Sequence, residues 1–204
     1  YGNNNIELVA ANELTNSGAI ESNKALKIAS VNASNSGNLL SGSNLNIVAA
    51  NNITNSGNIY GNNNIELVAA NELTNSGAIE SKEALNIEGL TFTNSGNLLS
   101  GSDLILVAQD NIINNGAISA GSSAYIFGGD SIDMSSGSLV ANNIDIQAAN
   151  DLDINGTIYS YGDLALTSNN ISLLASGVIA QDELSVSDLY LTASNNITNS
   201  GNIY

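Results

Sequence analysis

The sequence predicts an all-β fold, a right-handed parallel β-helix of roughly ten coils, with about 20 residues and three short strands in each coil. The prediction depends on three observations. A glycine returns at steps of 19 to 24 residues along the 204-residue chain, each glycine follows an asparagine or a serine, and an aliphatic residue stands two places after it. A period of this length is typical of solenoids, in which each coil packs only on its neighbours. The glycines are Gly18, Gly37, Gly57, Gly77, Gly96, Gly116, Gly137, Gly156, Gly177 and Gly201.

Apolar residues at fixed offsets from these glycines predict the strands. In the coil that follows Gly57, the first is Ile59, the next are Ile65 and Leu67, and the last is Leu73. Their alternation with polar residues has the period of two that places one side of a strand in a core. Turns rich in Asn, Ser and Gly separate the strands. We therefore expect three parallel sheets around a dry core.

An asparagine two places before the glycine predicts a ladder of stacked amides, because identical amides in successive coils can exchange hydrogen bonds. We also expect the neighbouring glycine to supply a positive φ for the turn. The asparagines are Asn16, Asn35, Asn55, Asn75, Asn94, Asn114 and Asn199.

A longer repeat organises the first half of the chain. Residues 1–22 return unchanged at 60–81, and similarity continues to about residue 118. We interpret 1–204 as a single β-solenoid fragment of a longer repeat tract, with 1–59 and 60–118 as duplicated three-coil units and 119–204 as diverged coils. The final coil is the longest, which predicts a surface bulge around Gln181 to Glu183 or Ser187 to Asp188.

Charge excludes several classes of partner. The chain has three basic and 19 acidic residues, a net charge of −16, and no cysteine, histidine or proline. It cannot neutralise a run of phosphates, so we predict no nucleic-acid partner, and its acidity disfavours anionic lipid. No apolar run approaches the length of a membrane span, so we predict no membrane insertion. No residues suggest a cofactor site.

The sequence predicts no enzyme. A polysaccharide-cleaving β-helix needs carboxylates combined with Arg, Lys or His, and the three lysines lie far from the acidic second half. A weak calcium candidate remains in Asp130, Asp133 and Asp153, whose carboxylates would lie on neighbouring coils. The alternative for these three residues is a solvated acidic edge.

One apolar patch is predicted to face outward. By the coil register, Ile105 and Val107 lie beside Tyr125 and Phe127 of the next coil, and all four point away from the core. Exposed apolar patches mark partner surfaces. The alternative is that the 21-residue coil shifts its register by one, so that Tyr125 and Phe127 turn inward.

The repeated unit resembles a known family. Asn-Ser-Gly-x-Ile/Leu, then Leu-x-Ile/Leu-x-Ala, then Asn-x-Ile/Leu-Thr-Asn-Ser-Gly is similar to the haemagglutinin repeats of filamentous haemagglutinin, found in the two-partner secretion exoproteins of Gram-negative bacteria. That family includes adhesins and contact-dependent inhibition effectors. The resemblance implies a right-handed β-helix that is exported unfolded and displayed as a fibre, secreted or at the cell surface, in association with the outer membrane.

From the residues and this resemblance we expect a structural stalk segment that extends a binding or toxin domain from the cell. Its expected partner is a receptor or glycan on a host or bacterial surface. The first alternative is a filament subunit that self-associates end to end. The second is a polysaccharide-active β-helix enzyme.

Overall fold

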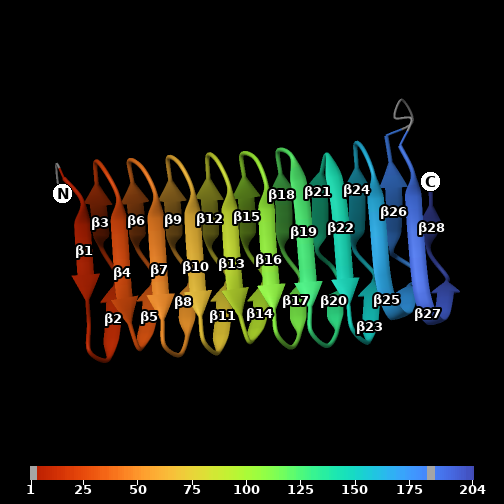
Figure 1. The fold of residues 1–204 in the computed structure, drawn as a ribbon, viewed down its shortest axis with the longest axis horizontal. Coiled ribbons are helices and arrows are strands. Elements are labelled where there is room, and N and C mark those ends of the chain that lie inside the picture. Colours follow the sequence, from red (N-terminus) through yellow and green to blue (C-terminus); the bar gives the residue numbers. More distant parts are fainter. Residues whose placement is uncertain (1–3, 183–186) are drawn as a thin grey trace.

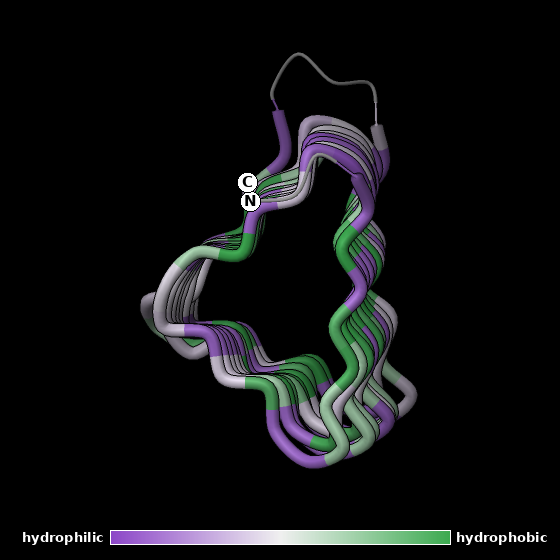
Figure 2. The backbone as a smooth tube through the Cα atoms, turned by 90° about the vertical axis from the view of Figure 1, so that its left-hand side faces the viewer, coloured by the Kyte–Doolittle hydropathy of each residue, from purple (hydrophilic) through white to green (hydrophobic). Residues whose placement is uncertain are grey.

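The structure is a computed structural model that describes residues 4–182 and 187–204. All regular secondary structure in these residues is β-strand, and every strand pairing is parallel. The described residues form ten coils, each with one strand in a sheet of ten strands. The coils stack along one axis (Figure 1) and lie almost over one another in a three-sided cross-section (Figure 2). The prediction of an all-β parallel solenoid of about ten coils is confirmed. Its handedness stays a prediction of the crossover rule.

The first face of the solenoid contains one strand from each coil, and we number the coils by these strands. The first eight strands are short, with four to six residues each. They are β1 (Ile6–Val9), β4 (Leu26–Ser30), β7 (Leu45–Ala49), β10 (Ile65–Ala69), β13 (Leu85–Gly89), β16 (Leu104–Ala108), β19 (Ser123–Gly128) and β22 (Asn143–Ala148).

The second face follows each of these strands after a corner. Its separate strands are β2 (Glu13–Asn16), β5 (Asn32–Asn35), β8 (Ile53–Asn55), β11 (Glu72–Asn75), β14 (Thr91–Asn94), β17 (Ile112–Asn114), β20 (Ile132–Met134) and β23 (Asp151–Ile154).

The third face completes each coil and forms a sheet of its own with ten strands. These are β3 (Ala19–Ser22), β6 (Asn38–Ser41), β9 (Asn58–Gly61), β12 (Ala78–Ser81), β15 (Asn97–Ser100), β18 (Ala117–Ala120), β21 (Ser138–Ala141), β24 (Thr157–Ser160), β26 (Val178–Gln181) and β28 (Asn202–Ile203).

The last two coils differ from the expected three short strands. β25 (Leu164–Leu173) and β27 (Leu189–Asn199) each run through both the first and the second face. They pair with a register shift between Ser168 and Asn170, where the long strand passes the corner. These two strands therefore join the first and second faces into one sheet of 18 strands.

The extra residues of the longest coil lie between β26, which ends at Gln181, and β27, which begins at Leu189. The predicted bulge falls in this connection. Of the residues named for it, Gln181, Asp182, Ser187 and Asp188 are described, whereas Glu183 lies outside the described residues.

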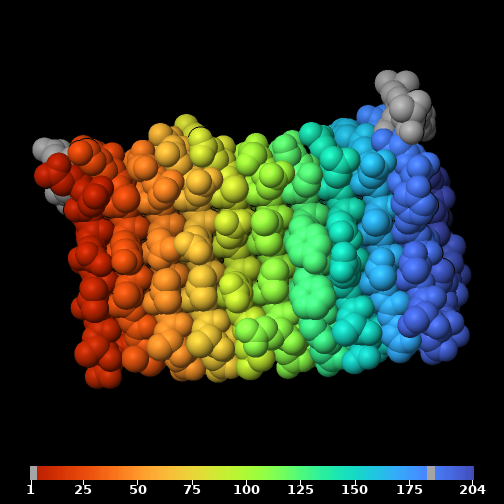
Figure 3. Space-filling view, viewed as in Figure 1, coloured from red at the N-terminus to blue at the C-terminus, as the bar shows by residue number. Residues whose placement is uncertain are grey.

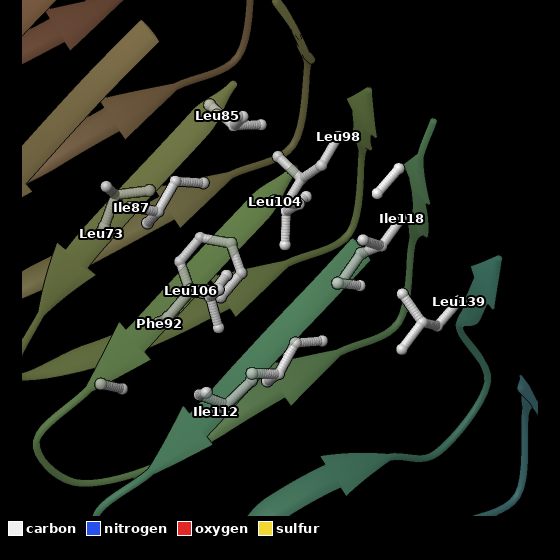
Figure 4. Packing of buried hydrophobic residues seen from close by; sticks show 14 of the residues in the cluster. Leu73, Leu85, Ile87, Phe92, Leu98, Leu104, Leu106, Ile112, Ile118 and Leu139 are labelled. Atoms are coloured by element: carbon white, nitrogen blue, oxygen red, sulfur yellow. The ribbon is translucent and has the colours of Figure 1, made fainter. Parts of the chain in front are cut away.

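Aliphatic side chains fill the interior, as the alternation predicts. The residue two places after the glycine is at most 1% exposed in every coil from Leu39 to Ile179. Phe92, the largest fully buried side chain, occupies the place of Leu73 and Ile112 in the coils on either side of it. Figure 4 shows these side chains pointing into the space that the three faces enclose.

The predicted amide ladder is present in six coils. Each asparagine donates from Nδ2 to Oδ1 of the next, and all five of these distances are 2.8 Å. The ladder ends where Asn114 Nδ2 meets Met134 Sδ at 3.9 Å. The ladder residues are Asn16, Asn35, Asn55, Asn75, Asn94 and Asn114.

Asn199 was expected in the same ladder, and that expectation is wrong. Its register partner in the preceding coil is Leu173, whose side chain has no amide with which to form a hydrogen bond. Asn199 is exposed, and its Oδ1 accepts a hydrogen bond from the backbone N–H of Gly201 at 3.1 Å.

The expected role of the repeat glycine is also wrong. No glycine among the described residues has a positive φ. A Cβ built on Gly77 would lie 2.0 Å from the carbonyl oxygen of Gly57, and Gly37, Gly96 and Gly116 have the same close approach to the coil before. Glycine is required because the turns stack backbone on backbone without room for a side chain.

A column of buried serines, which the hydrophobic pattern does not predict, closes the third face. Ser81, which is 1% exposed, donates from its hydroxyl to the carbonyl oxygens of Asn63 at 2.6 Å and Ala84 at 2.8 Å. Each serine thus satisfies backbone acceptors at the corner that leads to the next coil. The column contains Ser22, Ser41, Ser81, Ser100 and Ser160.

We predict that Gly77→Ala lowers the free energy of unfolding by about 1–3 kcal/mol, because the new Cβ meets backbone that cannot move aside. Gly18→Ala is the matched control, since a Cβ there has no atom within 4 Å. Urea denaturation followed by circular dichroism measures both. Equal midpoints for the two variants would contradict the stacking argument.

We predict that Asn75→Ala costs about 2–4 kcal/mol, because it removes the 2.8 Å acceptor of the buried Asn55 amide and the 2.8 Å donor to the buried Oδ1 of Asn94. Asn58→Ala is the control, since Asn58 donates to Asn38 Oδ1 at 2.9 Å in an exposed pair. It should cost less than about 0.5 kcal/mol. A similar loss of stability in both variants would mean that burial of the ladder contributes nothing.

Candidate partner-binding face

Two columns of side chains point outward from the first face, in register from coil to coil. The column nearer the start of each strand, which we call column X, contains Glu7, Lys27, Asn46, Glu66, Asn86, Ile105, Tyr125, Asp145, Ala165 and Tyr190. The column two residues further along, column Y, contains Val9, Ala29, Val48, Val68, Glu88, Val107, Phe127, Gln147, Thr167 and Thr192.

The structure places the four residues of the apolar patch together on this face. Ile105 pairs with Tyr125, and Val107 pairs with Phe127. Ile105 is 42% exposed, and the other three are half-buried. In Figure 3 the coil of β19 carries the bulkiest side chains on the face. We call these four residues the apolar ridge.

The alternative register, in which Tyr125 and Phe127 would turn into the core, is wrong. Ala124 and Ile126 occupy the inward places of β19 and are at most 1% exposed. The extra residue of this 21-residue coil lies after β20, since two residues lie between Met134 and Gly137, whereas one lies between Asn114 and Gly116. It lengthens a turn downstream and leaves the register of β19 unchanged.

A shallow hollow lies on each side of the apolar ridge. On the side of coils 4 and 5 it has a volume of about 260 Å³, and its lining includes Glu66, Glu88, Ile105 and Val107. On the side of coils 8 and 9 the hollow has a volume of about 350 Å³, and its lining includes Tyr125, Asn143, Asp145, Asp163 and Ala165. Carboxylates therefore border the ridge on both sides.

Cations are confined to the first part of the chain. Lys27 Nζ lies 3.5 Å from Glu7 Oε1, an exposed pair that contributes little to stability. Lys82 Nζ lies 5.9 Å from the ring centroid of Tyr60 on the third face. The sequence has no lysine or arginine after Lys82, whereas residues 83–204 contain 13 of the 19 acidic residues. The carboxylates of coils 8 and 9 beside the apolar ridge therefore lie in a region without positive charge.

Asp188 shows the effect of this charge on a neighbour. The hydroxyl of Tyr190 donates to Asp188 Oδ2 at 2.8 Å. This hydrogen bond, together with the negative charge of Asp188, raises the pKa of Tyr190 above its usual range. Tyr190 stays protonated and donates to the carboxylate at neutral pH.

The three calcium candidates are not brought together. Asp133 and Asp153 are neighbours in register on the second face. Asp130 lies in the corner before β20, where it accepts a hydrogen bond from Asn150, and Asp133 accepts one from Ser135. No three acidic side chains in residues 4–182 and 187–204 gather closely enough to hold a metal ion.

The described part of the chain has no helix that could cross a membrane. Comparison with families gives one finding. The model of the haemagglutinin repeat matches residues 2–80, 78–126 and 128–204, which together cover nearly the whole chain. Searches of curated proteins and of solved structures gave no match. A repeat of about 20 residues, a parallel solenoid and this threefold match together show that the chain belongs to the haemagglutinin repeat family.

Proposed function

We propose that the chain is a stalk segment of a bacterial surface adhesin or secreted exoprotein, whose role is to hold a binding or toxin domain away from the cell. The observation that supports this most is the unbroken register of the first face, where every coil pairs with the next from β1 to β27. Length in such a fold grows by about 4.8 Å with each coil.

The internal bonding suits a stiff spacer. Parallel strands place their backbone hydrogen bonds along the fibre axis, and the buried amide ladder adds a second line of bonds in the same direction. Stability then depends on contacts between neighbouring coils, so coils can be added without changing the core. Haemagglutinin repeat proteins are secreted or surface exoproteins, and we extend that location to this chain.

We propose no catalytic role. Acid–base catalysis needs a positioned donor and acceptor with suitable pKa values. The chain has no histidine or arginine, and its lysines lie at positions 24, 27 and 82, away from the acidic coils. No cluster of side chains among the residues that the structure describes favours the polysaccharide-active alternative.

End-to-end self-association is a second candidate, and one observation favours it. Residues 195–204 are identical to 51–60, and residues 1–22 are identical to 60–81. Within the chain, Ile53 and Asn55 pair with Leu73 and Asn75 in the next coil. Two copies of the 204-residue chain could repeat these contacts. Concentration-dependent rods in electron micrographs would support this candidate, and a monomer at all concentrations would contradict it.

We predict that deletion of residues 60–118 removes three coils and leaves a folded rod about 14 Å shorter. Ser119 would take the place of Tyr60, to which it corresponds in register through Glu80 and Leu99. Small-angle scattering measures the length, and circular dichroism measures the β-sheet. As a control, deletion of ten residues, 60–69, breaks the register and should prevent folding. An unfolded 60–118 variant would contradict the modular stalk.

Adhesion by the stalk itself is tested with labelled chain on bacterial and epithelial cells. We predict that any binding is lost in the variant Ile105→Ser, Tyr125→Ser, Phe127→Ser. The control variant Leu40→Ser, Tyr60→Ser, Leu99→Ser changes outward residues of the third face and should bind as the parent does. Equal loss in both variants would contradict a site on the first face, and no binding by the parent would leave length as the function.

A further inference from the structure

The apolar ridge and its two hollows form one surface, not three. Ile105 and Val107 line the hollow on the side of coils 4 and 5, and Tyr125 lines the hollow on the side of coils 8 and 9. The order along the fibre axis is therefore carboxylates, apolar side chains, carboxylates. In coil 2, by contrast, Lys27 adds a cation to column X.

The charges decide which ligand fits. Glu66 and Glu88 border the ridge on one side, and Asp145 and Asp163 border it on the other. An anionic ligand would be repelled from both sides, whereas an ammonium or guanidinium group would gain charge-assisted hydrogen bonds to these carboxylates. The ring of Tyr125 adds a face on which a cation can rest.

The spacing decides the pattern of the ligand. Glu88 belongs to coil 5 and Asp145 to coil 8, so three coil steps separate them, about 14 Å along the axis. An extended peptide rises about 3.4 Å per residue, so its residues i and i+4 are about 14 Å apart and point to the same side as residue i+2. An apolar residue at i+2 would then lie over the ridge.

We propose that the first face of coils 4–9 binds an extended basic segment of a partner protein with the pattern cation-x-apolar-x-cation, in which the cations enter the two hollows and the apolar side chain packs on the ridge. The proposal deepens the proposed function by naming the chemistry of a stalk partner. The partner supplies the positive charge that coils 6–10 of this chain lack.

The hollow on the side of coils 8 and 9 has room for a cation because one of its lining residues is small. Ala165 occupies column X between Asp145 and Tyr190, and its small side chain leaves the floor open. Asp163 Oδ1 accepts the backbone N–H of Asp188 at 3.2 Å, and Gln147 Nε2 donates to Asp145 Oδ2 at 3.0 Å. These contacts hold the carboxylates in place and leave further lone pairs for a ligand.

The test uses an acetylated and amidated peptide, Gly-Ser-Lys-Ser-Leu-Ser-Lys-Ser-Gly, labelled for fluorescence anisotropy, with the whole 204-residue chain. A peptide of the same composition with adjacent lysines is the control for spacing, and one with glutamate in place of lysine is the control for charge. We expect the spaced lysine peptide to bind at least about tenfold more tightly than either control. Equal affinity for the two lysine peptides would overturn the proposal.

Variants locate the site. Glu88→Gln with Asp145→Asn should weaken binding of the spaced peptide about tenfold. Asp151→Asn with Asp153→Asn removes the same charge from the second face and should change the affinity less than about twofold at 0.15 M salt, where the Debye length is about 8 Å. Equal weakening by the two double variants would show non-specific attraction and overturn the proposal.

A variant that adds a positive charge, instead of removing negative ones, distinguishes loss of binding from loss of the fold. Ala165→Lys places a cation of the chain's own beside Asp145, so it should block the peptide while keeping or raising the melting temperature. Unchanged peptide binding in this folded variant would overturn the proposal. The proposal would also be overturned if the chain did not bind the peptide but bound a neutral oligosaccharide, and if that binding depended on Tyr125. The stalk proposal is tested separately by the 60–118 deletion, so either can fail alone.

Discussion

The constraint on which the structure depends is the fixed spacing of about 4.8 Å between coils, which puts equivalent residues of successive coils in direct contact. Asn75 can be fully buried because Asn55 and Asn94 stand one coil away on either side and complete its hydrogen bonds at 2.8 Å. Gly77 can only be glycine because the carbonyl oxygen of Gly57 occupies the space of a side chain. The residue type at a position in this fold therefore depends on the equivalent residues of the neighbouring coils as much as on its own strand.

The end of the amide ladder shows how a column changes identity without loss of packing. Met134 takes the place after Asn114, and its thioether is a weak acceptor for the last amide. Ile154 and Leu173 then continue the column as buried apolar residues. A direct step from asparagine to isoleucine would leave an amide donor facing hydrocarbon, so methionine is the residue that lets the polar half of the column meet the apolar half.

The sequence predicted which strand residues are buried and which asparagines stack, and it missed or left open the features that depend on the path of the chain at the corners. The alternation around Ile65 and Leu67 predicted which side chains are buried, because period-two patterning depends only on the strand itself. The acceptors of Ser81 come from Asn63 and Ala84, at a corner that no local pattern marks, so the serine column went unrecognised. The orientation of Tyr125 was left open because a 21-residue coil permits two registers, and only the pairing with Ile105 places the extra residue after Met134.

The same separation of core and surface bears on function. The side chains of columns X and Y point outward while their strand neighbours point into the core, so coils with the same interior can carry lysine, valine or aspartate outside. The 13 acidic residues after position 82 make parallel rods repel one another, and this repulsion is screened beyond about 8 Å at physiological salt. Apolar contact between two copies at the ridge would bring their carboxylates inside that distance, which opposes lateral aggregation. A basic partner brings its own counter-charge to the same surface, so the charge pattern that keeps the fibres apart is also the one that favours a cationic ligand.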